Sequence, residues 1–402
     1  MRIWHIITGE YPPQGGGVSD YTWLVATGLA AAGDKVHVWA PRCGLLTDSS
    51  GAVEVHRLSG HFGPRALMAV SRAVRAEPAC SLLVQYVPHA YGFKAMNVPL
   101  CLWLNFIHPA ELIVMFHEVA FPMSRDQPLQ HNLLGVVTTL MARLVSRAAT
   151  RIIVASERWQ SMLNRLCATT PISWLPVPST IPLVDNAAAT AQWRTRCTKT
   201  GGLLMGHFAN YSDYSVERLS QIVPGLLSGA RGLSLLLLGA NSNELRRHLL
   251  QRNHHLEGSI HASGRLARQD LSSALSACDV MVQPYPDGVS TRRSSTSALM
   301  AHGRAVVTTE GIATEPLWMN DDAVAMAPAG DANRLRQVTA QMLSSAELRD
   351  RYAQGALKLY DRRFALHHTI AALIGDSPIR SEWPASAYGG SVAGSSSVSS
   401  LR

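Results

Sequence analysis

The sequence lacks a long hydrophobic run and an ordered pattern of cysteines. Its most apolar stretch after the start, residues 98–116, contains Asn105, His108, Pro109 and Glu111 and is too polar to span a bilayer. The six cysteines are scattered and form no C-x-x-C pair, so we expect a reduced setting and no metal site. The first apolar run, residues 1–8, is too short for a signal peptide. These features predict a cytoplasmic protein.

Signatures of nucleotide and nucleic-acid binding are also missing. Gly15, Gly16 and Gly17 follow the first predicted strand, but Asp20 stands where G-x-G-x-x-G requires a glycine. No G-K-S or G-K-T motif is present, so neither dinucleotide nor P-loop binding is supported. We also find no zinc-finger spacing and no basic-aromatic array, and therefore expect no nucleic-acid partner.

The chain does have the size and composition of a two-domain globular protein. It has 402 residues, of which 47% are hydrophobic and 16% charged, enough for two full cores. Its formal net charge of +8 favours anionic partners such as nucleotides, phosphorylated lipids or a membrane surface. A basic surface without a partner would have the same charge. The charge does not choose among these partners; a peripheral contact with the inner face of a membrane through this surface is one of the interpretations.

Short aliphatic runs alternate with helical periods along most of the chain, which predicts parallel sheets covered on both faces. The alternation lapses around residues 176–200, which contain three prolines and an alanine-rich polar segment, and we place the domain boundary there. The expected fold is α/β, with two doubly wound Rossmann-like domains facing across a cleft. The predicted parts are domain one (1–182), a linker (183–200), domain two (201–364), a helix (365–375) and a disordered, serine-rich tail (376–402).

The most informative stretch is the polar loop 283–295, between a predicted strand at 279–282 and a short helix at 296–303. It contains Arg292 and Arg293 and several hydroxyl side chains. Loops at the carboxyl ends of parallel strands are where open α/β sheets bind ligands. A helix that begins beside two arginines is suited to an anion. We therefore interpret this loop as a ligand site; the alternative is a solvated basic loop.

The order and motifs of four segments resemble the retaining glycosyltransferases of family 4, which have the GT-B fold. The segment 298–307, Ala-Leu-Met-Ala-His-Gly-Arg-Ala-Val-Val, is similar to the family's E-A-M-A-x-G-x-P-V-V. The resemblance covers roughly residues 1–375 and is more specific in the second half. The four segments are the glycine-rich loop 10–18, the strand end 114–118, the segment 264–280 and the segment 298–307.

The resemblance implies a site in the cleft, with the acceptor on domain one and the donor on domain two. His117 matches the family's histidine that contacts the transferred sugar; taken alone, it would be a core histidine. Glu315 resembles a glutamate of the donor domain, or it caps a helix. The implied donor-binding residues are Asp287, Gly288, Ser290, Arg292, Arg293, Ser294 and Glu315.

On the acceptor side, Gly15, Gly16, Gly17 and Asp20 are the candidates. The glycines can bring backbone N–H groups to a phosphate or to the acceptor, or they form only a permissive turn. Asp20 stands at the start of the first helix, where it either meets an acceptor or interacts with the helix dipole.

The sequence departs from the family in the donor loop. The family usually has two glutamates eight positions apart. When the loop is aligned on Gly303, those places hold Ser290 and Ala298; when it is aligned on Asp287, the second place holds Ser295. The family's arginine and lysine after the first strand of domain two are also absent. We expect Arg292 and Arg293 to take over the phosphate role, since guanidinium forms bidentate bonds to phosphate oxygens.

The predicted function is transfer of a sugar from a nucleotide-sugar to a glycan, lipid or small-molecule acceptor with retention of configuration. The nucleotide-sugar is a substrate, and no cofactor or metal is expected. The alternative is a non-catalytic glycosyltransferase-like binding or scaffold protein, which the missing glutamates favour. The polar donor loop argues against it.

Overall fold

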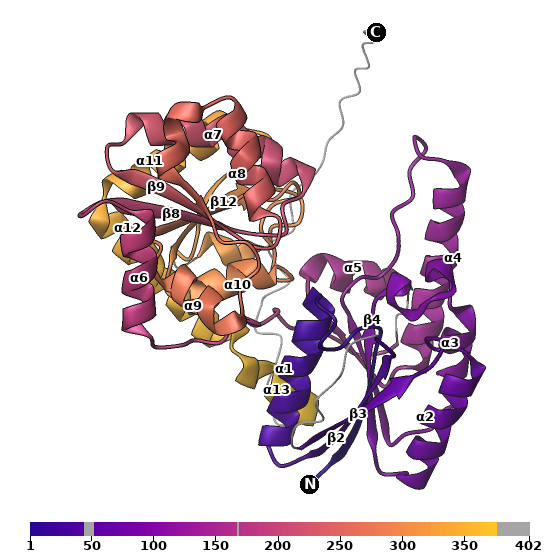
Figure 1. The fold of residues 1–402 in the computed structure, drawn as a ribbon. Coiled ribbons are helices and arrows are strands. Elements are labelled where there is room, and N and C mark those ends of the chain that lie inside the picture. Colours follow the sequence, from indigo (N-terminus) through magenta and orange to yellow (C-terminus); the bar gives the residue numbers. More distant parts are fainter. Residues whose placement is uncertain (44–51, 167–168, 321, 376–402) are drawn as a thin grey trace.

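The structure is a computed structural model, and it describes residues 1–43, 52–166, 169–320 and 322–375. The chain forms two α/β domains, one built from the first half of the sequence and one from the second (Figure 1). This confirms the predicted fold class. The tail predicted to be disordered, 376–402, lies outside the described residues.

The first domain contains a seven-stranded parallel sheet in the order β3-β2-β1-β4-β5-β6-β7. Its central strands are continuous aliphatic runs because helices cover both faces of the sheet, so side chains on both faces are buried. The strands are β1 (Ile3–Thr8), β2 (Lys35–Pro41), β3 (Val53–Leu58), β4 (Ser81–Tyr86), β5 (Glu111–Phe116), β6 (Arg151–Val154) and β7 (Ile172–Trp174).

Helices α1 (Gly17–Ala31), α2 (Pro64–Ala76), α3 (Val98–Trp103), α4 (Leu129–Ala148) and α5 (Glu157–Leu166) complete the first domain, with short turns η1 (Pro88–Tyr91) and η2 (Phe93–Ala95). Proline stands at the first turn of α2 and of α3, where its missing N–H costs nothing. Within the described ranges, no helix is both long and apolar enough to cross a bilayer.

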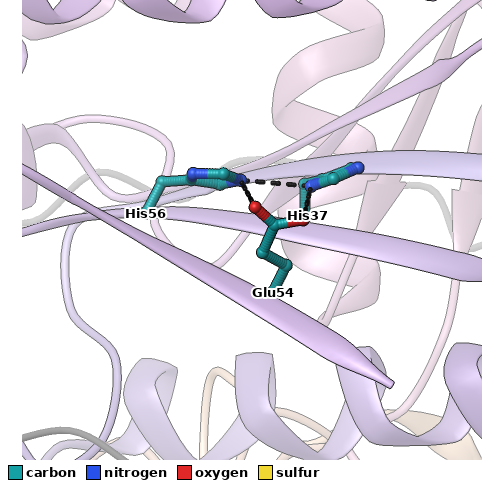
Figure 2. Close-up of side chains that lie close together, drawn as sticks. All are labelled: His37, Glu54 and His56. Atoms are coloured by element: carbon teal, nitrogen blue, oxygen red, sulfur yellow. Dashed lines mark hydrogen bonds and ion pairs between the residues drawn. The ribbon is translucent and has the colours of Figure 1, made fainter. Parts of the chain in front are cut away.

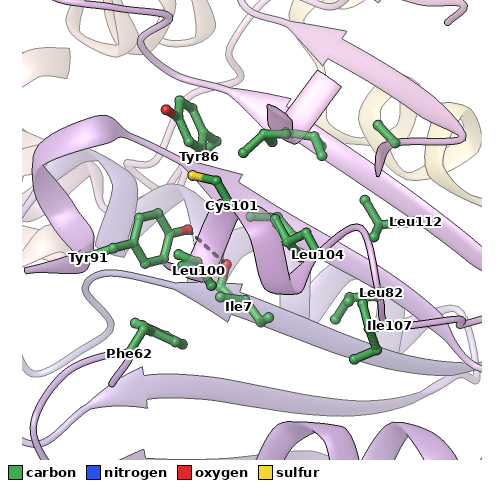
Figure 3. Packing of buried hydrophobic residues seen from close by; sticks show 14 of the residues in the cluster. Ile7, Phe62, Leu82, Tyr86, Tyr91, Leu100, Cys101, Leu104, Ile107 and Leu112 are labelled. Carbon is green, nitrogen blue, oxygen red and sulfur yellow. Dashed lines mark hydrogen bonds between the residues drawn. The ribbon is translucent and has the colours of Figure 1, made fainter. Parts of the chain in front are cut away.

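One of the hydrophobic clusters of this domain lies between the sheet and helices α2, α3 and α4. Tyr86, Tyr91 and Cys101 are buried in it among leucines and isoleucines (Figure 3). The buried Tyr91 hydroxyl donates a hydrogen bond to the Gln85 carbonyl oxygen at 2.6 Å, so its polar atom is satisfied. Cys80, Cys101, Cys197 and Cys278 are all buried, as expected for cysteines used as small hydrophobic residues.

The second domain contains a six-stranded parallel sheet in the order β10-β9-β8-β11-β12-β13. Strand β9 is Leu-Ser-Leu-Leu-Leu-Leu and all six residues are buried, which is typical of a central strand covered on both faces. The strands are β8 (Leu203–Phe208), β9 (Leu233–Leu238), β10 (Ile260–Ala262), β11 (Val280–Gln283), β12 (Ala305–Glu310) and β13 (Ala325–Pro328).

Hydrophobic clusters on both faces of this sheet form the second core. The helices are α6 (Ala187–Cys197), α7 (Asp213–Gly229), α8 (Ser242–Gln251), α9 (Arg268–Ser276), α10 (Ser294–Ala301), α11 (Ala332–Ser344), α12 (Ala346–Leu359) and α13 (Leu366–Ile374), with shorter turns η3 (His254–Ser259), η4 (Pro316–Met319) and η5 (Tyr360–Phe364).

The segment 183–200, predicted as the linker between the domains, contains helix α6, which the sequence pattern did not indicate. This helix packs on α9. Asn186 begins the helix by accepting a hydrogen bond from the Ala189 backbone at 3.0 Å. Arg194 anchors it through the Ala277 carbonyl oxygen and the Asp279 carboxylate. A helix held by polar contacts of this kind has no clear apolar period, which is why the pattern missed it.

Helix α13 returns to the first domain and packs against α1 (Figure 1). The Arg151 guanidinium, at the start of β6, donates to the carbonyl oxygens of Ala372 and Leu373 at 2.7 and 2.9 Å. These carbonyls are in the last turn of α13, where they have no partner within the helix. Gly28 allows the close approach, because a side chain there would meet Ile370. The chain therefore crosses between the domains twice.

Candidate functional site

The carboxyl ends of the two sheets meet at the contact between the domains. The Gly15 backbone lies close to the Arg265 guanidinium, which follows β10, and Asp20 on α1 forms an ion pair with Arg268 on α9. On the other side of the contact, Thr291 in the loop after β11 approaches Ala155, which follows β6. Loops from both sheets therefore enclose the place where such folds bind ligands.

Asp287 organises the donor loop by binding both of its arginines. One carboxylate oxygen accepts from Arg292 at 2.9 Å and the other from Arg293. Each guanidinium also lies over an aromatic ring: Arg292 over Trp159 at 5.6 Å and Arg293 over Tyr285 at 4.5 Å. Burial opposes the charge of Asp287, but Arg293 and Arg292 outweigh it and lower its pKa below the usual value. Two cations are thus held in a fixed arrangement.

Glu315 lies inside the protein rather than at its surface. It is 3% exposed, and its oxygens lie 3.1 and 3.2 Å from the Thr291 backbone nitrogen, while Trp318 donates to it at 2.9 Å. The Thr291 hydroxyl oxygen is 2.7 Å from both the Glu315 carboxyl and the Ala155 carbonyl oxygen. This places Glu315 beneath the donor loop, where it supports Thr291.

The single hydroxyl proton of Thr291 determines how this network is satisfied. The hydroxyl cannot donate to Ala155 and to Glu315 at once. If Glu315 is protonated, it donates to the hydroxyl, and the hydroxyl donates to Ala155, so every group has a partner. Burial raises the pKa of Glu315, which favours this protonated form, although the hydrogen bonds from Thr291 and Trp318 oppose the rise.

Several buried polar atoms near this edge of the second sheet have no hydrogen-bond partner within the described residues. They are the Ser290 hydroxyl, the Arg293 Nε and both ring nitrogens of His207, which lies near the end of β8. Buried polar groups are nearly always paired, so unpaired groups need an explanation. Here they lie at the end of β8 and in the loop after its neighbour β11, at the edge where a bound ligand would supply partners.

His117 follows directly after β5 and is fixed by two neighbours. Its Nε2 donates to the side-chain oxygen of Gln85 at 2.7 Å, and its ring meets the Tyr21 ring edge-on at 5.0 Å between centroids. Burial lowers the pKa of His117 to about 4, so the ring is neutral at pH 7. Its Nδ1 is then an acceptor for a hydroxyl group.

The glycine loop is shaped by Glu10. The Glu10 carboxylate accepts from the Ser19 backbone at 2.9 Å and occupies the space that a side chain on Gly16 would need. Gly17, at the first position of α1, has nothing near its absent side chain, so its place is open. Asp20, in the first turn of α1, is held by Arg268 and is therefore engaged across the domain contact.

The remaining donor-loop residues have defined roles in the backbone. Gly288 has a φ of 89°, and a side chain there would collide with Gly311 and Thr314, so only glycine lets the loops after β11 and β12 pack together. Ser294 is the first residue of α10, next to Arg293. The structure thus gathers Asp287, Arg292 and Arg293 into one cluster.

Sequence reasoning missed Arg265 and Arg268. Arg265 faces Gly15, and Arg268 lies 4.5 Å from the Trp23 ring in addition to its pair with Asp20. They follow β10, whereas the family resemblance directed attention to the segment after β8. The segment 264–280, which resembles the family, contains both arginines, and this was the signal that could have identified them.

A separate pocket of about 490 Å³ lies between α7 and α11. It is lined by Leu203 and Leu233, the first residues of β8 and β9, so it is at the amino edge of the second sheet. Ligands of open α/β sheets bind at the opposite edge, and this pocket is therefore not the candidate site.

Comparison with known proteins agrees with this geometry. The family model for glycosyl transferases group 1 matches residues 202–345, most of the second domain. The solved sucrose-phosphate synthase of Thermosynechococcus elongatus is 16% identical with a TM-score of 0.69, and the match covers 93% of this chain and 98% of that one. No curated protein sequence matches the chain.

Two further structures are similar over the same extent. WaaG, a glycosyltransferase of lipopolysaccharide biosynthesis, is 14% identical with a TM-score of 0.67, covering 93% of this chain and 100% of that one. Anabaena HepE, solved with UDP and glucose, is 15% identical with a TM-score of 0.65, and the match covers 93% of this chain and 98% of that one. The chain therefore has the GT-B fold. Most of its second domain matches the family model for glycosyl transferases group 1, and this match supports a glycosyltransferase.

We predict that Glu315→Gln removes a pH-dependent loss of stability. A carboxyl with a raised folded-state pKa stabilises the fold below its unfolded pKa, near 4.5, and this contribution is lost as pH rises through the folded value. Glutamine imitates the protonated acid and does not titrate. The free energy of unfolding of the variant minus that of the native protein should therefore increase from pH 4 to pH 7, by about 1.4 kcal/mol per unit of pKa rise.

Urea unfolding at several pH values measures this difference. The exposed Glu347→Gln variant controls for the loss of a charge alone. A difference that stays flat over this range would show that Glu315 is ionised in the folded protein at no cost.

Proposed function

We propose that the protein transfers a sugar from a nucleotide-sugar, with retention of anomeric configuration, to an acceptor bound by the first domain. The observation that carries the proposal is the pair of arginines on Asp287, at the carboxyl edge of the domain that matches the glycosyltransferase model. HepE was solved with UDP and glucose, which supports a UDP-sugar as the first donor to test.

The arginines fit the chemistry of the leaving group. Breaking the anomeric C–O bond leaves a nucleoside diphosphate that gains negative charge, and fixed cations stabilise that charge in the transition state. Arg292 and Arg293 are preorganised by Asp287 and by the rings beneath them. Arg265 adds positive charge from the neighbouring loop, next to Gly15, while the charge of Arg268 is balanced by Asp20. The site thus supplies cations without the arginine and lysine that the family carries elsewhere.

Asp287 has a second role in this proposal. One alignment of the loop places Asp287 where the family has its first donor-loop glutamate, and the other alignment places Ser290 there. When the diphosphate binds the guanidinium groups, it competes with the carboxylate, whose oxygens then turn to the sugar hydroxyls. Glu315 does not fill the place of the missing second carboxylate, because its oxygens are already bonded to Thr291 and Trp318. The ribose contact then falls to hydroxyl side chains such as Ser294.

We predict that the double variant Arg292→Ala/Arg293→Ala binds the donor at least about tenfold more weakly, since each lost charged hydrogen bond is worth about 1.5–3 kcal/mol. Calorimetry with UDP-, GDP-, ADP- and dTDP-sugars measures the donor affinity and identifies the nucleotide base that the protein prefers. The double variant Arg72→Ala/Arg75→Ala, on an exposed part of α2, removes the same charge and is the control.

The double variant Arg292→Lys/Arg293→Lys keeps both charges and guards against an effect on folding alone. It should bind with intermediate affinity, because lysine lacks the planar fork of the guanidinium. If none of the nucleotide-sugars binds the native protein, the donor site is wrong and the scaffold alternative becomes the better explanation.

We predict that His117→Ala lowers the rate of sugar transfer about 10- to 100-fold with little change in donor affinity. The neutral ring accepts a hydrogen bond from the transferred sugar, and this bond matters most in the transition state. Release of nucleotide from the donor, to acceptor or to water, measures the rate. His108→Ala, an exposed histidine before the start of the same strand, is the control. An unchanged rate would exclude His117 from the reaction.

The peripheral membrane contact also stays a proposal, and α4 offers a surface for it. Leu129, Leu133, Val136 and Leu140 follow a helical period along α4 and are 87%, 61%, 56% and 48% exposed. Figure 1 shows α4 at the outer edge of the first domain. An apolar stripe on a basic protein is suited to an anionic bilayer surface.

We predict that the protein co-sediments with vesicles of anionic phospholipid, less so at high salt, and that Leu133→Ser/Val136→Ser reduces the bound fraction several-fold. Leu357→Ser, on α12, is the control for loss of an exposed leucine. Failure of the native protein to bind anionic vesicles would contradict the proposal.

A further inference from the structure

The first sheet carries a cluster of histidines that the cleft does not use. His37 on β2 and Glu54 and His56 on β3 lie on one face of the sheet, because β2 and β3 pair with His37 beside Glu54 and Trp39 beside His56. Figure 2 shows the two imidazole rings and the carboxylate turned toward one another. The cluster lies toward the amino ends of these strands, whereas the cleft is at the carboxyl ends.

The distances within this cluster match a set of metal ligands. The His37 Nδ1 is 3.1 Å from the His56 Nε2 and 3.2 Å from a Glu54 oxygen, and the His56 Nε2 is 3.5 Å from the other Glu54 oxygen. Ligands at 2.0–2.1 Å from a tetrahedral zinc ion lie about 3.3 Å apart. The two nitrogens, and each nitrogen with one of the two Glu54 oxygens, lie close to this separation, so the three groups are near enough together to share one ion.

The rings are held in this orientation by their neighbours. The His56 ring stacks on Trp39 with 4.0 Å between centroids, and the His37 ring stacks on His5 at 4.9 Å. The Trp39 Nε1 donates to the His5 Nδ1 at 3.0 Å, which leaves the His5 Nε2 to donate to Glu77 at 3.0 Å. A preorganised arrangement of this kind reduces the cost of ordering ligands around an ion.

Groups beyond the three ligands also fit a cation. The far nitrogen of His37, Nε2, is buried, has no hydrogen-bond partner among the residues that the structure describes, and lies 3.8 Å from the Glu77 carboxylate. Metal-bound histidines usually have a carboxylate or carbonyl on the opposite nitrogen, which orients the ring. The side chains of His56 and Glu54 are 27% and 60% exposed, so an ion and a water molecule can reach the cluster from solvent.

We infer that His37, Glu54 and His56 bind a divalent zinc ion, with water at the remaining position, and that the ion ties the edge strand β3 to β2. Two imidazoles and one carboxylate, without a thiolate, favour Zn²⁺ over Cu⁺ and over the hard ions Mg²⁺ and Ca²⁺. No spacing in the sequence indicates this site, because His37 reaches the other two ligands only through strand pairing. The site is separate from the proposed transfer reaction.

The structural alternative is a hydrogen-bonded triad. In it, one imidazole proton between the His37 Nδ1 and the His56 Nε2 pairs these two nitrogens, since the distance between them is within hydrogen-bond range. The two explanations differ in whether zinc binds and in what it does to stability.

The test is a zinc titration of the full chain, without an affinity tag and dialysed against chelator. We expect one equivalent of Zn²⁺ that is not displaced by Mg²⁺ or Ca²⁺. At a free zinc concentration about a hundredfold above the Kd, the unfolding equilibrium constant should fall about a hundredfold. Cobalt(II) in place of zinc should show the visible absorption of a tetrahedral complex. None of these readouts uses glycosyl transfer, so their failure would leave the proposed function untouched.

His56→Gln and Glu54→Gln are the variants of choice, since both side chains are partly exposed and should be replaced without loss of the fold. Each should weaken zinc binding at least about tenfold and remove the stabilisation by zinc. His254→Gln, an exposed histidine of the second domain, should change neither. Two results would overturn the inference: no zinc binding by the native chain, or binding and stabilisation that persist in both variants through other histidines among the sixteen.

Discussion

The hydrogen bonds around Thr291 join the donor loop to the first domain, and the arrangement of the cleft depends on them. The side-chain oxygen of Thr291 meets Ala155 and Trp174, both of the first domain, and its carbonyl oxygen accepts from Val177 at 2.9 Å. On the other side Thr291 is bonded to Glu315. The residue next to it, Arg292, begins the cationic pair. The position of the cations is therefore set by contacts with both domains, and a relative movement of the domains would have to break these bonds or carry the loop along.

In the proposed donor site, Glu315 does not replace the carboxylate that the loop lacks. The Glu315 carboxyl is bonded to Thr291 and holds it in place. In its protonated form, Glu315 completes a chain of buried hydrogen-bond donors and acceptors without a buried charge. The charges that remain near the surface of the loop are those of Asp287 and the two arginines, which sum to one positive charge. A loop with net positive charge at the carboxyl edge of a sheet suits a diphosphate, and a carboxylate between two guanidinium groups keeps them apart and ordered until a ligand arrives.

The fold could be predicted from the sequence because its signal is local. Runs such as Leu233–Leu238 and Glu111–Phe116 form strands whose side chains are buried on both faces of the sheet. The order of these strands and of the helices along the chain predicts the two parallel sheets. Helix α6 escaped prediction because Arg194 and Asn186, rather than an apolar stripe, hold it in place. The position of α6 therefore depends on contacts with distant segments and not on a local sequence pattern.

The site was less accessible because its contacts join residues far apart in the chain. The donor loop was evident from its composition, and the structure gathers Asp287, Arg292 and Arg293 as one cluster. The interior position of Glu315 depends on Trp318 and on a threonine 24 residues away, which no pattern encodes. Arg265 and Arg268 can be recognised only from their contacts with Gly15 and Asp20 of the other domain. The roles of these residues in transfer stay predictions.

The two ends of the first sheet illustrate one physical rule with different consequences. At the carboxyl end, the strands finish in loops, so His117 after β5 meets Tyr21 on the helix that follows β1. Toward the amino end, His37 and His56 are brought together by register, within the sheet itself. Loops can move with a ligand, whereas a strand pair cannot move without breaking its ladder. A reactive group is therefore better placed at the first end, and an ion that only holds strands together is better placed at the second.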